Sequence, residues 1–251
     1  MPVKDIFREK RAVLDQLHRG KKPHGEVHST AGGYIREVVF GFNDGLVSNF
    51  ALVTGVAGAA LGPAVILVAG LAEMMAAAIS MGMNAYLSSR AQIEYYLEEI
   101  AREKREIEND PAHERQELRE LYRLKGFEGG LLDKIVATLS RNKKIWLRVM
   151  LEEELGISET QFASPAKIGV IMCIAALVGG FVPLIAYLFL PVALALPASW
   201  AISLAGIFLL GAAKTRVTKR NWIRSGLEML TLGFIAALAT YWLGTFIGGA
   251  F

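Results

Sequence analysis

The positions of the basic residues constrain this chain more than any other feature. All 27 Lys and Arg residues of the 251-residue sequence lie within residues 1–36, 90–167 and 214–224. The stretches 37–89, 168–213 and 225–251 contain none. Long segments without a basic residue are typical of membrane-spanning helices, because a charged side chain is costly in the hydrocarbon core. The pattern predicts a polytopic membrane protein. It excludes an ordinary globular enzyme, a nucleic-acid-binding domain and a disordered chain.

The composition agrees with this interpretation. Hydrophobic residues make up 53% of the chain, charged residues only 20%, and the mean hydropathy is +0.37. Soluble domains carry charge on about a quarter of their residues. The single cysteine, Cys173, lies in an apolar stretch, so neither a disulfide framework nor a thiolate metal cluster is expected. The N-terminal arm is polar, so we expect no cleavable signal peptide and a first apolar helix that directs insertion.

Five stretches are long enough to cross a hydrocarbon core of about 30 Å, which needs roughly 20 residues of helix. They are residues 38–61, 64–89, 166–190, 192–213 and 226–250. The expected fold class is all-α, with five transmembrane helices and a three-helix insert. Its expected divisions are an arm (1–36), spans one and two (37–89), the insert (90–164) and spans three to five (165–251). With five spans, one side holds every Lys and Arg, and the positive-inside rule places that side in the cytoplasm.

Three ionisable residues lie well inside the spans: Asp44, Glu73 and Glu228. Glu228 is near the start of the fifth span and is interpreted as a snorkelling acid paired with Arg224. Asp44 and Glu73 are deeper, where a lone carboxylate costs a few kcal/mol. Such acids usually face a bundle interior or an aqueous pathway, so Asp44 and Glu73 are candidate pathway residues. A purely structural hydrogen-bonding role is the alternative.

The neighbours of these acids suggest how the helices approach one another. At 3.6 residues per turn, Glu37, Gly41, Asp44, Ser48 and Gly55 fall on one stripe of span one. Gly41 and Gly45 have the GxxxG spacing that permits close helix contact. The stripe predicts either simple helix packing or a site at the interface between two subunits, with span one at a two-fold axis.

Span two adds sulfur to the candidate site. Glu73, Ala77, Ser80 and Asn84 share one face, and Met81 lies beside it. Methionine is commonly a flexible core filler. Carboxylate and thioether together suit Fe²⁺ or another first-row divalent ion better than Na⁺ or Ca²⁺.

The insert carries carboxylates at helical spacing. Asp110 and Pro111 form a helix start, Gly126 ends that helix, and a third helix ends before Gly156. The acidic rows are Glu99, Glu103 and Glu106; Glu114, Glu117 and Glu120; and Glu153 and Glu154, with Met150 one turn earlier. Rows of carboxylates on facing helices can bind divalent metal ions. Interleaved Arg and Lys residues leave the solvated helix face open as an alternative.

Several of these segments resemble the vacuolar iron transporter family. The resemblance lies in Arg36 to Ser48, which contains Asn-Asp-Gly-Leu-Val-Ser, in Gly70 to Met74, in Ser80 to Gly82, and in the insert at Asp110 to Leu118, Tyr122 to Gly126 and Glu153 to Gly156. These segments occur in the family's order over residues of about 25–250.

The resemblance implies a five-span homodimer that exports Fe²⁺, often also Mn²⁺, from the cytosol in exchange for protons. It implies that Asp44 and Met81 form the pathway site between subunits, with Glu73, Asn43 and Glu37 nearby. It assigns metal binding in the insert to Glu103, Glu106, Glu114, Glu117, Met150 and Glu154. Leu151 replaces an acid of some relatives, so Glu153 is a further candidate ligand. Zn²⁺ and Co²⁺ are other candidate ions. The membrane is the cell membrane in a prokaryote and a vacuolar or other endomembrane in a eukaryote.

Two other functions remain as alternatives. A passive divalent-cation channel also uses carboxylates along its path. A membrane di-iron oxidase needs clustered histidines or Glu-x-x-His pairs, but the four histidines (His18, His24, His28 and His113) all lie outside the expected spans. We therefore expect a transporter and not an enzyme. The arm's three histidines are interpreted as part of a polar tail.

Overall fold

The computed structural model describes residues 34–158, 161–215 and 221–250, and these ranges contain helices and no strand. Two compact units divide the chain. The described residues of 88–164 form one unit, called the insert below. Residues 34–87 and 165–250 contain the other, called the membrane unit. The prediction of an all-α chain is confirmed for the described residues.

The membrane unit contains α2 (Ile35–Gly58), the first half of α3 (Pro63–Asn109), α7 (Pro165–Phe181), η3 (Val182–Leu184), α8 (Ile185–Phe189), α9 (Val192–Ala213) and α11 (Trp222–Ala250). Among the described residues, four helical segments are long and apolar enough to cross a membrane: Pro63–Asn109, Pro165–Phe189, Ala193–Ala213 and Trp222–Ala250. Helix α2 is not among them, because Asn43, Asp44 and Asn49 lower its hydropathy.

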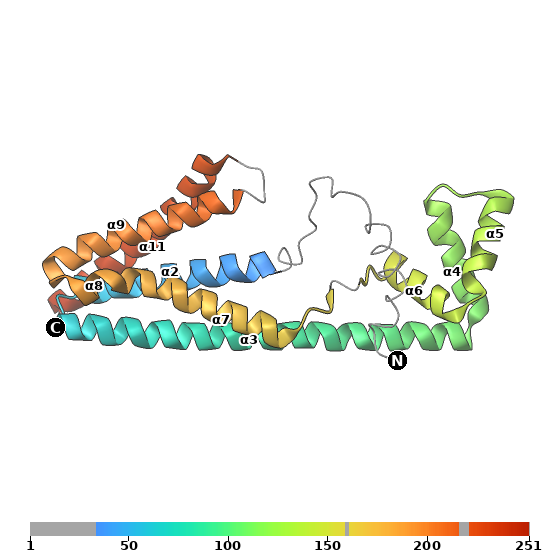
Figure 1. The fold of residues 1–251 in the computed structure, drawn as a ribbon, viewed down its shortest axis with the longest axis horizontal. Helices are drawn as coiled ribbons and strands as arrows, with labels where there is room; N and C mark the ends of the chain where they lie inside the picture. Colours follow the sequence, from blue (N-terminus) through green and yellow to red (C-terminus); the bar gives the residue numbers. More distant parts are fainter. Residues whose placement is uncertain (1–33, 159–160, 216–220, 251) are drawn as a thin grey trace, which may run out of the picture. The chain divides into compact units, whose positions relative to one another are not determined.

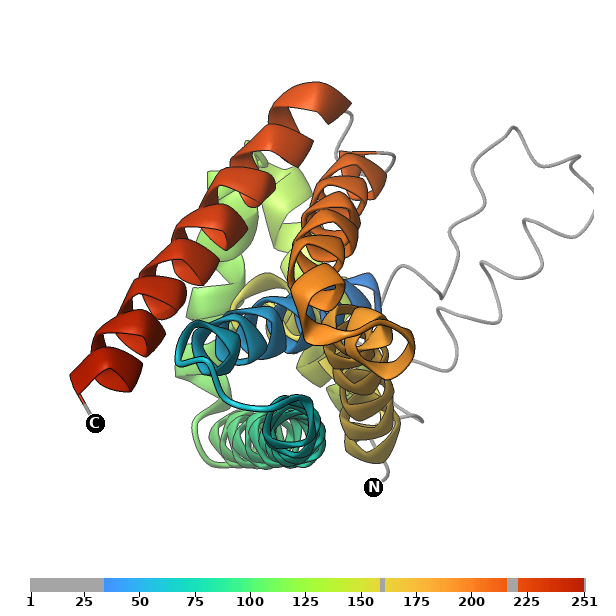
Figure 2. The same ribbon diagram turned by 90° about the vertical axis from the view of Figure 1, so that its left-hand side faces the viewer.

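Helix α2 is nevertheless the central helix of the membrane unit. In Figure 2 it lies between α3, α7, α9 and α11. Leu46, Phe50 and Val53 of α2 are fully buried. Small residues bring the neighbours close: Gly45 lies against Ala176 of α7, and Gly55 lies against Gly244 of α11. A Cβ atom at Gly45 or at Gly244 would collide with the backbone of the neighbouring helix, so glycine permits this packing.

The same contacts give the helix directions. Gly41 lies beside Met172, and Gly45 beside Ala176, so α2 and α7 run in parallel. By the same reasoning α11 is parallel to α2, whereas α3 and α9 run the opposite way (Figure 1). The first residues of α2, α7 and α11 therefore lie at one end of the membrane unit. The last residues of α9, and the last residues of α3 that belong to this unit, lie at the same end. The basic residues of this unit that border these helices, Arg36, Lys167, Lys214 and Arg224, belong to that end.

The third expected span is interrupted. Pro183 has no N–H group and follows α7 in the short η3 turn, which leads into α8. Two carbonyl groups at the interruption accept side-chain hydrogen bonds from other helices. Asn49 Nδ2 of α2 donates to the Gly180 carbonyl at 2.6 Å, and Ser199 Oγ of α9 donates to the Pro183 carbonyl at 2.8 Å. These two bonds connect α2 and α9 to the end of α7 and the turn after it.

The insert comprises the second half of α3 followed by α4 (Pro111–Leu124), α5 (Gly129–Ser140) and α6 (Lys143–Glu153). The helix start at Asp110 is confirmed, because the Asp110 carboxylate accepts the His113 N–H at 3.2 Å. The expectation of three helices in the insert was wrong, because two helices, α5 and α6, occupy the region where a single third helix was expected. Asn142 is extended and its side chain accepts the N–H groups of Lys144 and Ile145, which caps a new helix at that point.

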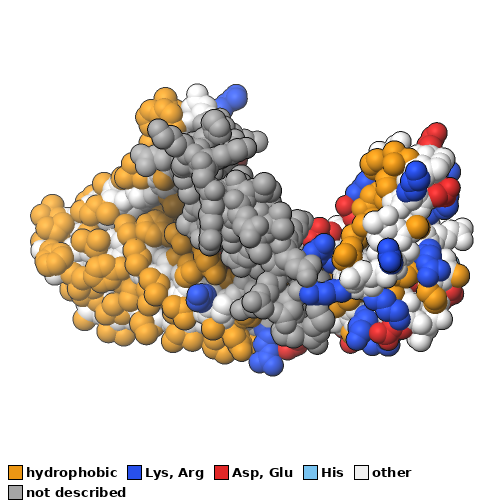
Figure 3. Space-filling model, turned by 45° about the vertical axis from the view of Figure 1, so that its right-hand side comes forward, with side chains coloured by type: hydrophobic (Ala, Val, Ile, Leu, Met, Phe, Trp, Pro, Cys, Tyr) orange, Lys and Arg blue, Asp and Glu red, His pale blue; other side chains and the backbone are white. Residues whose placement is uncertain are grey.

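The insert has an apolar core of its own. Ile107, Leu118, Leu132, Val136, Trp146 and Met150 form one buried cluster, and Ile100, Leu151 and Ile157 form a second. In Figure 3 the visible face of the membrane unit is mostly hydrophobic, whereas many charged side chains are spread over the insert. The two units therefore have the surfaces of a lipid-embedded bundle and of a water-exposed domain.

Candidate metal sites

The insert buries two carboxylates from two different helices. Glu103 of α3 and Glu114 of α4 are each only 3% exposed. Oε1 of Glu103 and Oε2 of Glu114 have no hydrogen-bond partner among the described residues. A buried carboxylate without a partner is costly, so such groups usually pair with a cation or hold a proton.

Burial and neighbouring negative charge raise the pKa of both groups. Burial, followed by the charges of Glu154 and Glu114, raises the pKa of Glu103 from 4.5 to about 8. Burial and the charge of Glu117 also raise the pKa of Glu114. All these neighbours are acids of the insert. The arrangement therefore concentrates negative charge at one place, where a divalent cation could replace the protons.

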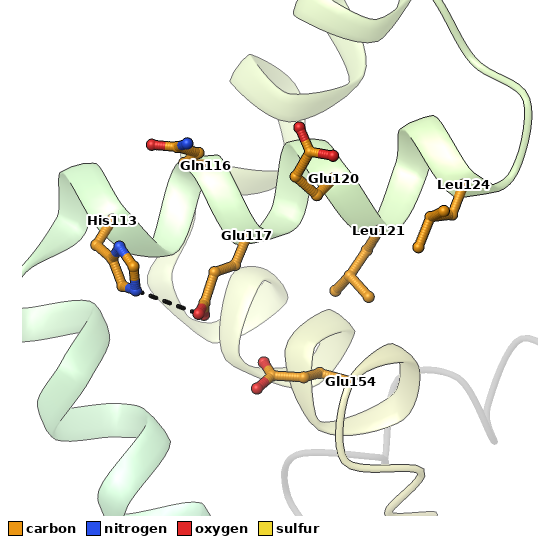
Figure 4. A pocket seen from close by; sticks show the side chains of 7 residues that line it. All are labelled: His113, Gln116, Glu117, Glu120, Leu121, Leu124 and Glu154. Carbon is orange, nitrogen blue, oxygen red and sulfur yellow. Dashed lines mark ion pairs between the residues drawn. The ribbon is translucent and has the colours of Figure 1, made fainter.

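Other acids of the insert line an open pocket (Figure 4). The pocket has a volume of about 320 Å³ and is lined by His113, Gln116, Glu117, Glu120, Leu121, Leu124 and Glu154. Glu117 comes from α4 and Glu154 from the end of α6, and both side chains point into the space between the two helices in Figure 4. Nε2 of His113 lies 3.3 Å from Oε1 of Glu117.

The candidate metal ligands at the end of α6 occupy different environments. Met150 is fully buried in the apolar core beside α4, and Leu151 is fully buried with Ile100 and Ile157. Leu151 therefore contributes core packing at a position with no access to the pocket. Glu153 forms an ion pair with Lys125, whose Nζ also lies 5.0 Å from the centre of the Tyr122 ring. Glu154 is the acid of this helix that lines the pocket.

Other acids of the insert are partly neutralised by basic residues. Glu99 accepts a hydrogen bond from Arg102 at 2.6 Å, and Glu106 lies 4.0 Å from Arg102. Glu120 pairs with Arg123 at 2.6 Å. Within the described residues, no three His, Cys, Asp or Glu side chains already stand close enough together to hold a metal ion. Metal binding by this cluster therefore requires side-chain rotation.

The membrane unit places its acids differently. Asp44 is exposed on the surface of the single chain, although it lies in the central helix α2. Glu73 and Met81 of α3, and Asn43 of α2, are half-buried. The described residues contain no hydrogen bond or ion pair to the side chain of Asp44 or Glu73. The structure thus leaves these two carboxylates without a polar partner from the described part of the chain.

The predicted stripe on α2 is not uniformly buried. Glu37 and Gly41 are buried, whereas Asp44 is exposed. Gly41 and Gly45 pack against α7 of the same chain, so they are not available to a partner helix. The glycine spacing indicated close helix contact correctly but could not identify the partner. Oε1 of Glu37 accepts a hydrogen bond from Arg36 at 2.8 Å, and its Oε2 has no partner among the described residues.

Sequence reasoning missed two polar features. One is Asn49, which connects α2 to the interruption after α7; the Asn in a helix otherwise rich in apolar residues was its only signal. The other is His113, which was noted only for lying outside the spans. Its spacing of four residues from Glu117 was the signal that could have identified it.

A bundle of apolar helices with carboxylates in mid-helix, joined to an acidic helical domain, is typical of an integral membrane protein that handles cations. Comparison with known proteins agrees. Residues 35–245 match the VIT family. The chain belongs to the VIT family.

Three relatives illustrate the similarity. Vacuolar iron transporter 1 of Arabidopsis thaliana is 35% identical over 236 residues, which cover 94% of this chain and 92% of the relative. Vacuolar iron transporter 1 of Tulipa gesneriana is 36% identical over 219 residues, 87% of this chain and 89% of the relative. The vacuolar iron transporter of Plasmodium berghei is 32% identical over 249 residues, 95% and 91% respectively. These relatives are transporters and not enzymes, as the sequence predicted for this chain.

Proposed function

We propose that this protein is a homodimeric, proton-coupled transporter that exports Fe²⁺, and also Mn²⁺, from the cytosol. The observation that carries the proposal is the exposed Asp44 on the central helix of the membrane unit. A carboxylate that faces lipid costs a few kcal/mol or more. The relatives' names supply the ion, because they are called iron transporters.

Helix α2 is the fifth membrane span in this proposal. Its 24 residues extend about 36 Å at 1.5 Å per residue, which exceeds a hydrocarbon core of about 30 Å. Its polar residues are compatible with this position because other helices surround most of α2. The end of the membrane unit that carries the basic residues is then cytoplasmic, together with the insert.

A second copy of the chain completes the pathway site. Asp44 and Phe40 are one turn apart on the exposed side of α2, and Phe40 is 56% exposed. If this side meets its equivalent at a two-fold axis, two Asp44 carboxylates face each other instead of lipid. Met81 and Glu73 on the neighbouring helix can then add a thioether and a third carboxylate, a mixture that suits Fe²⁺.

Facing carboxylates also explain the proton coupling. Two like charges at close range in a low dielectric favour retention of a proton. A divalent ion that binds there must displace the proton, and the empty site takes up a proton again after the ion leaves. The cycle is an exchange of metal for protons, with the insert collecting metal on the cytoplasmic side. An acidic far compartment drives it.

The test is Fe²⁺ and Mn²⁺ flux into proteoliposomes, with and without a pH gradient. Exchange predicts that an acidic far side accelerates the flux strongly. Flux that is the same with and without the pH gradient would favour a passive channel and contradict the proton coupling.

The dimer is tested separately by cross-linking in bilayers. In a Cys173→Ala background, Phe40→Cys should form dimers, whereas Leu209→Cys, an equally exposed position on α9, should not. Cross-linking of neither variant, with a monomer in bilayers, would contradict the assembly.

A further inference from the structure

We propose that His113 is a metal ligand of the insert and that, with Glu117 and Glu154, it forms an outer site that prefers Fe²⁺, Co²⁺ and Zn²⁺ to Mn²⁺. The inference rests on the proposed function, because it names a further ligand and a selectivity for the same cytoplasmic domain. It assigns a role to the one histidine that the structure describes.

The start of α4 fixes the backbone of His113. Asp110 caps the helix by accepting the His113 N–H, and Pro111 occupies the first helical position. Helical spacing then brings the imidazole beside Glu117, four residues later, with 3.3 Å between Nε2 and Oε1. An exposed pair of this kind would stabilise the helix by only about 0.3–0.5 kcal/mol. Its position beside a pocket is what gives it another use.

The pocket has the space and the charge for a cation. Its volume is about 320 Å³, and one water needs roughly 10–15 Å³ of such space, so a divalent ion fits with part of its hydration shell. Its lining includes Glu117, Glu120 and Glu154, and no Lys or Arg is among the lining residues that the structure describes. Glu154 comes from a different helix, so an ion bound between it and His113 would join α4 to α6 (Figure 4).

The buried pair provides a second, independent indication of a ligand. Glu103 and Glu114 keep carboxylate oxygens without hydrogen-bond partners while being almost fully buried. Glu117 lies one turn after Glu114 on α4 and is the acid whose charge acts most strongly on Glu114, so the pocket lies next to the buried pair, although neither Glu103 nor Glu114 lines it. The site at His113 is therefore the outer of the two, open to solvent, where an arriving ion first exchanges waters for protein ligands.

The ligand types determine the selectivity. Imidazole nitrogen suits Fe²⁺, Co²⁺ and Zn²⁺, whereas Mn²⁺ is better matched by carboxylate and water oxygens. Removal of the imidazole should therefore lower the affinity for Co²⁺ by about tenfold, the size of effect typical of losing a supporting ligand. The affinity for Mn²⁺ should change by less than about twofold.

The histidine content permits a direct test on the whole protein. The chain has four histidines, and three of them, His18, His24 and His28, lie outside the described residues. In the variant His18→Gln/His24→Gln/His28→Gln, an imidazole bound to metal must be His113. X-ray absorption of this variant in detergent with one equivalent of Co²⁺ should contain the scattering pattern of a coordinated imidazole ring.

Two further variants provide the controls. His113→Gln in the same background should bind Co²⁺ with oxygen ligands only, and with about tenfold lower affinity. Gln116→Ala alters the same pocket without removing the imidazole and should retain the ring signal. Co²⁺ bound through oxygen alone when His113 is present would overturn the inference but not the proposed metal binding. Absence of any Co²⁺ binding to the insert would contradict both.

Discussion

The carboxylates of the membrane unit and those of the insert differ in how completely one chain surrounds them. In the insert, Glu103 and Glu114 come from two helices and are 3% exposed, with further acids of the same chain around them. In the membrane unit, Asp44 is on the surface of the chain with no polar partner among the described residues. The carboxylates of the insert are enclosed by one copy of the chain, whereas Asp44 of the membrane unit is exposed on the surface of that copy.

The difference indicates separate tasks for the two sites. If the enclosed cluster binds metal, as proposed, each copy can do so by itself. An open carboxylate on a membrane helix has to be covered by something other than lipid. Metal collection should thus be a property of the single chain and translocation a property of the assembly. Experiments that measure metal binding and metal flux separately test this distinction.

The largest expected effect is on flux through the membrane unit. Asp44→Asn should abolish Fe²⁺ flux in proteoliposomes, because an amide can neither neutralise the ion nor carry the proton. Metal binding by the insert, measured calorimetrically on the same protein, should be unchanged. Glu228→Gln, the same chemical change at an exposed position of α11, is the matched control and should transport normally. Wild-type flux in Asp44→Asn would refute the role of this residue.

The second expected effect is the converse of the first: metal binding by the insert is weakened while flux through the membrane unit is retained. Glu103→Gln removes a carboxyl group of the buried pair that could exchange its proton for a metal ion, and it should lower the metal affinity of the insert by tenfold or more, on the order seen for ligand-shell changes. Flux at saturating metal should persist, because the pathway residues are untouched. Calorimetry and flux on the same preparation measure both. A loss of flux equal to the loss of binding would show that the two sites do not act separately.

Stability of the metal-free insert should depend on pH in an unusual direction. The pKa of Glu103 rises from 4.5 to about 8, so between these values the folded state binds a proton that the unfolded state does not. The free energy of unfolding should therefore fall as pH rises through this window, by on the order of 1–3 kcal/mol. Hydrogen exchange of the insert in the whole protein, compared at pH 5.5 and 8, measures it. Glu103→Gln should flatten the dependence.

Much of the fold could be predicted from the distribution of charge. The absence of basic residues located the helices of the membrane unit, four of which are long and apolar enough to cross a membrane, and the Asp110 cap and Gly126 located the ends of α4. The interruption after α7 escaped prediction because its hydrogen bonds come from Asn49 and Ser199, which are distant in sequence. The division of the last insert helix depends on a single cap at Asn142 within an otherwise helical pattern.

The site was predictable in its residue types but not in its partners. Helical spacing grouped Glu103 with Glu106, yet only packing determines that the first is buried and the second is exposed. Likewise, spacing grouped Asp44 with Gly41 on one stripe, whereas a bundle that surrounds α2 buries only part of that stripe. Periodicity within one helix gives relative angles, but the number of neighbouring helices decides which angles are covered.

The glycines of α2 offer a test of what holds the single chain together. Gly45→Ala should lower the stability of the bundle by about 1–3 kcal/mol, because the added methyl group collides with the backbone of Ala176 in the same chain. Gly62→Ala has no atom within 4 Å of the new methyl and is the control. Thermal unfolding in detergent measures the loss. If Gly45→Ala instead left stability unchanged and only dissociated dimers, Gly45 would be at the subunit interface after all.

The smallest expected effect concerns Glu153, the acid next to the proposed ligand Glu154. Its ion pair with Lys125 holds it on the outside of the insert, and it does not line the pocket. A partly exposed ion pair of this kind contributes about 0–1 kcal/mol, so Glu153→Gln should alter stability by less than that. The affinity for Co²⁺ should change by less than about twofold, because only the long-range charge is lost.

Glu154→Gln is the matched substitution one residue later and should weaken Co²⁺ binding by about tenfold. Calorimetric titration of the two variants side by side measures the contrast. Equal losses would mean that the ion pair with Lys125 opens when metal arrives and that Glu153 joins the ligand set.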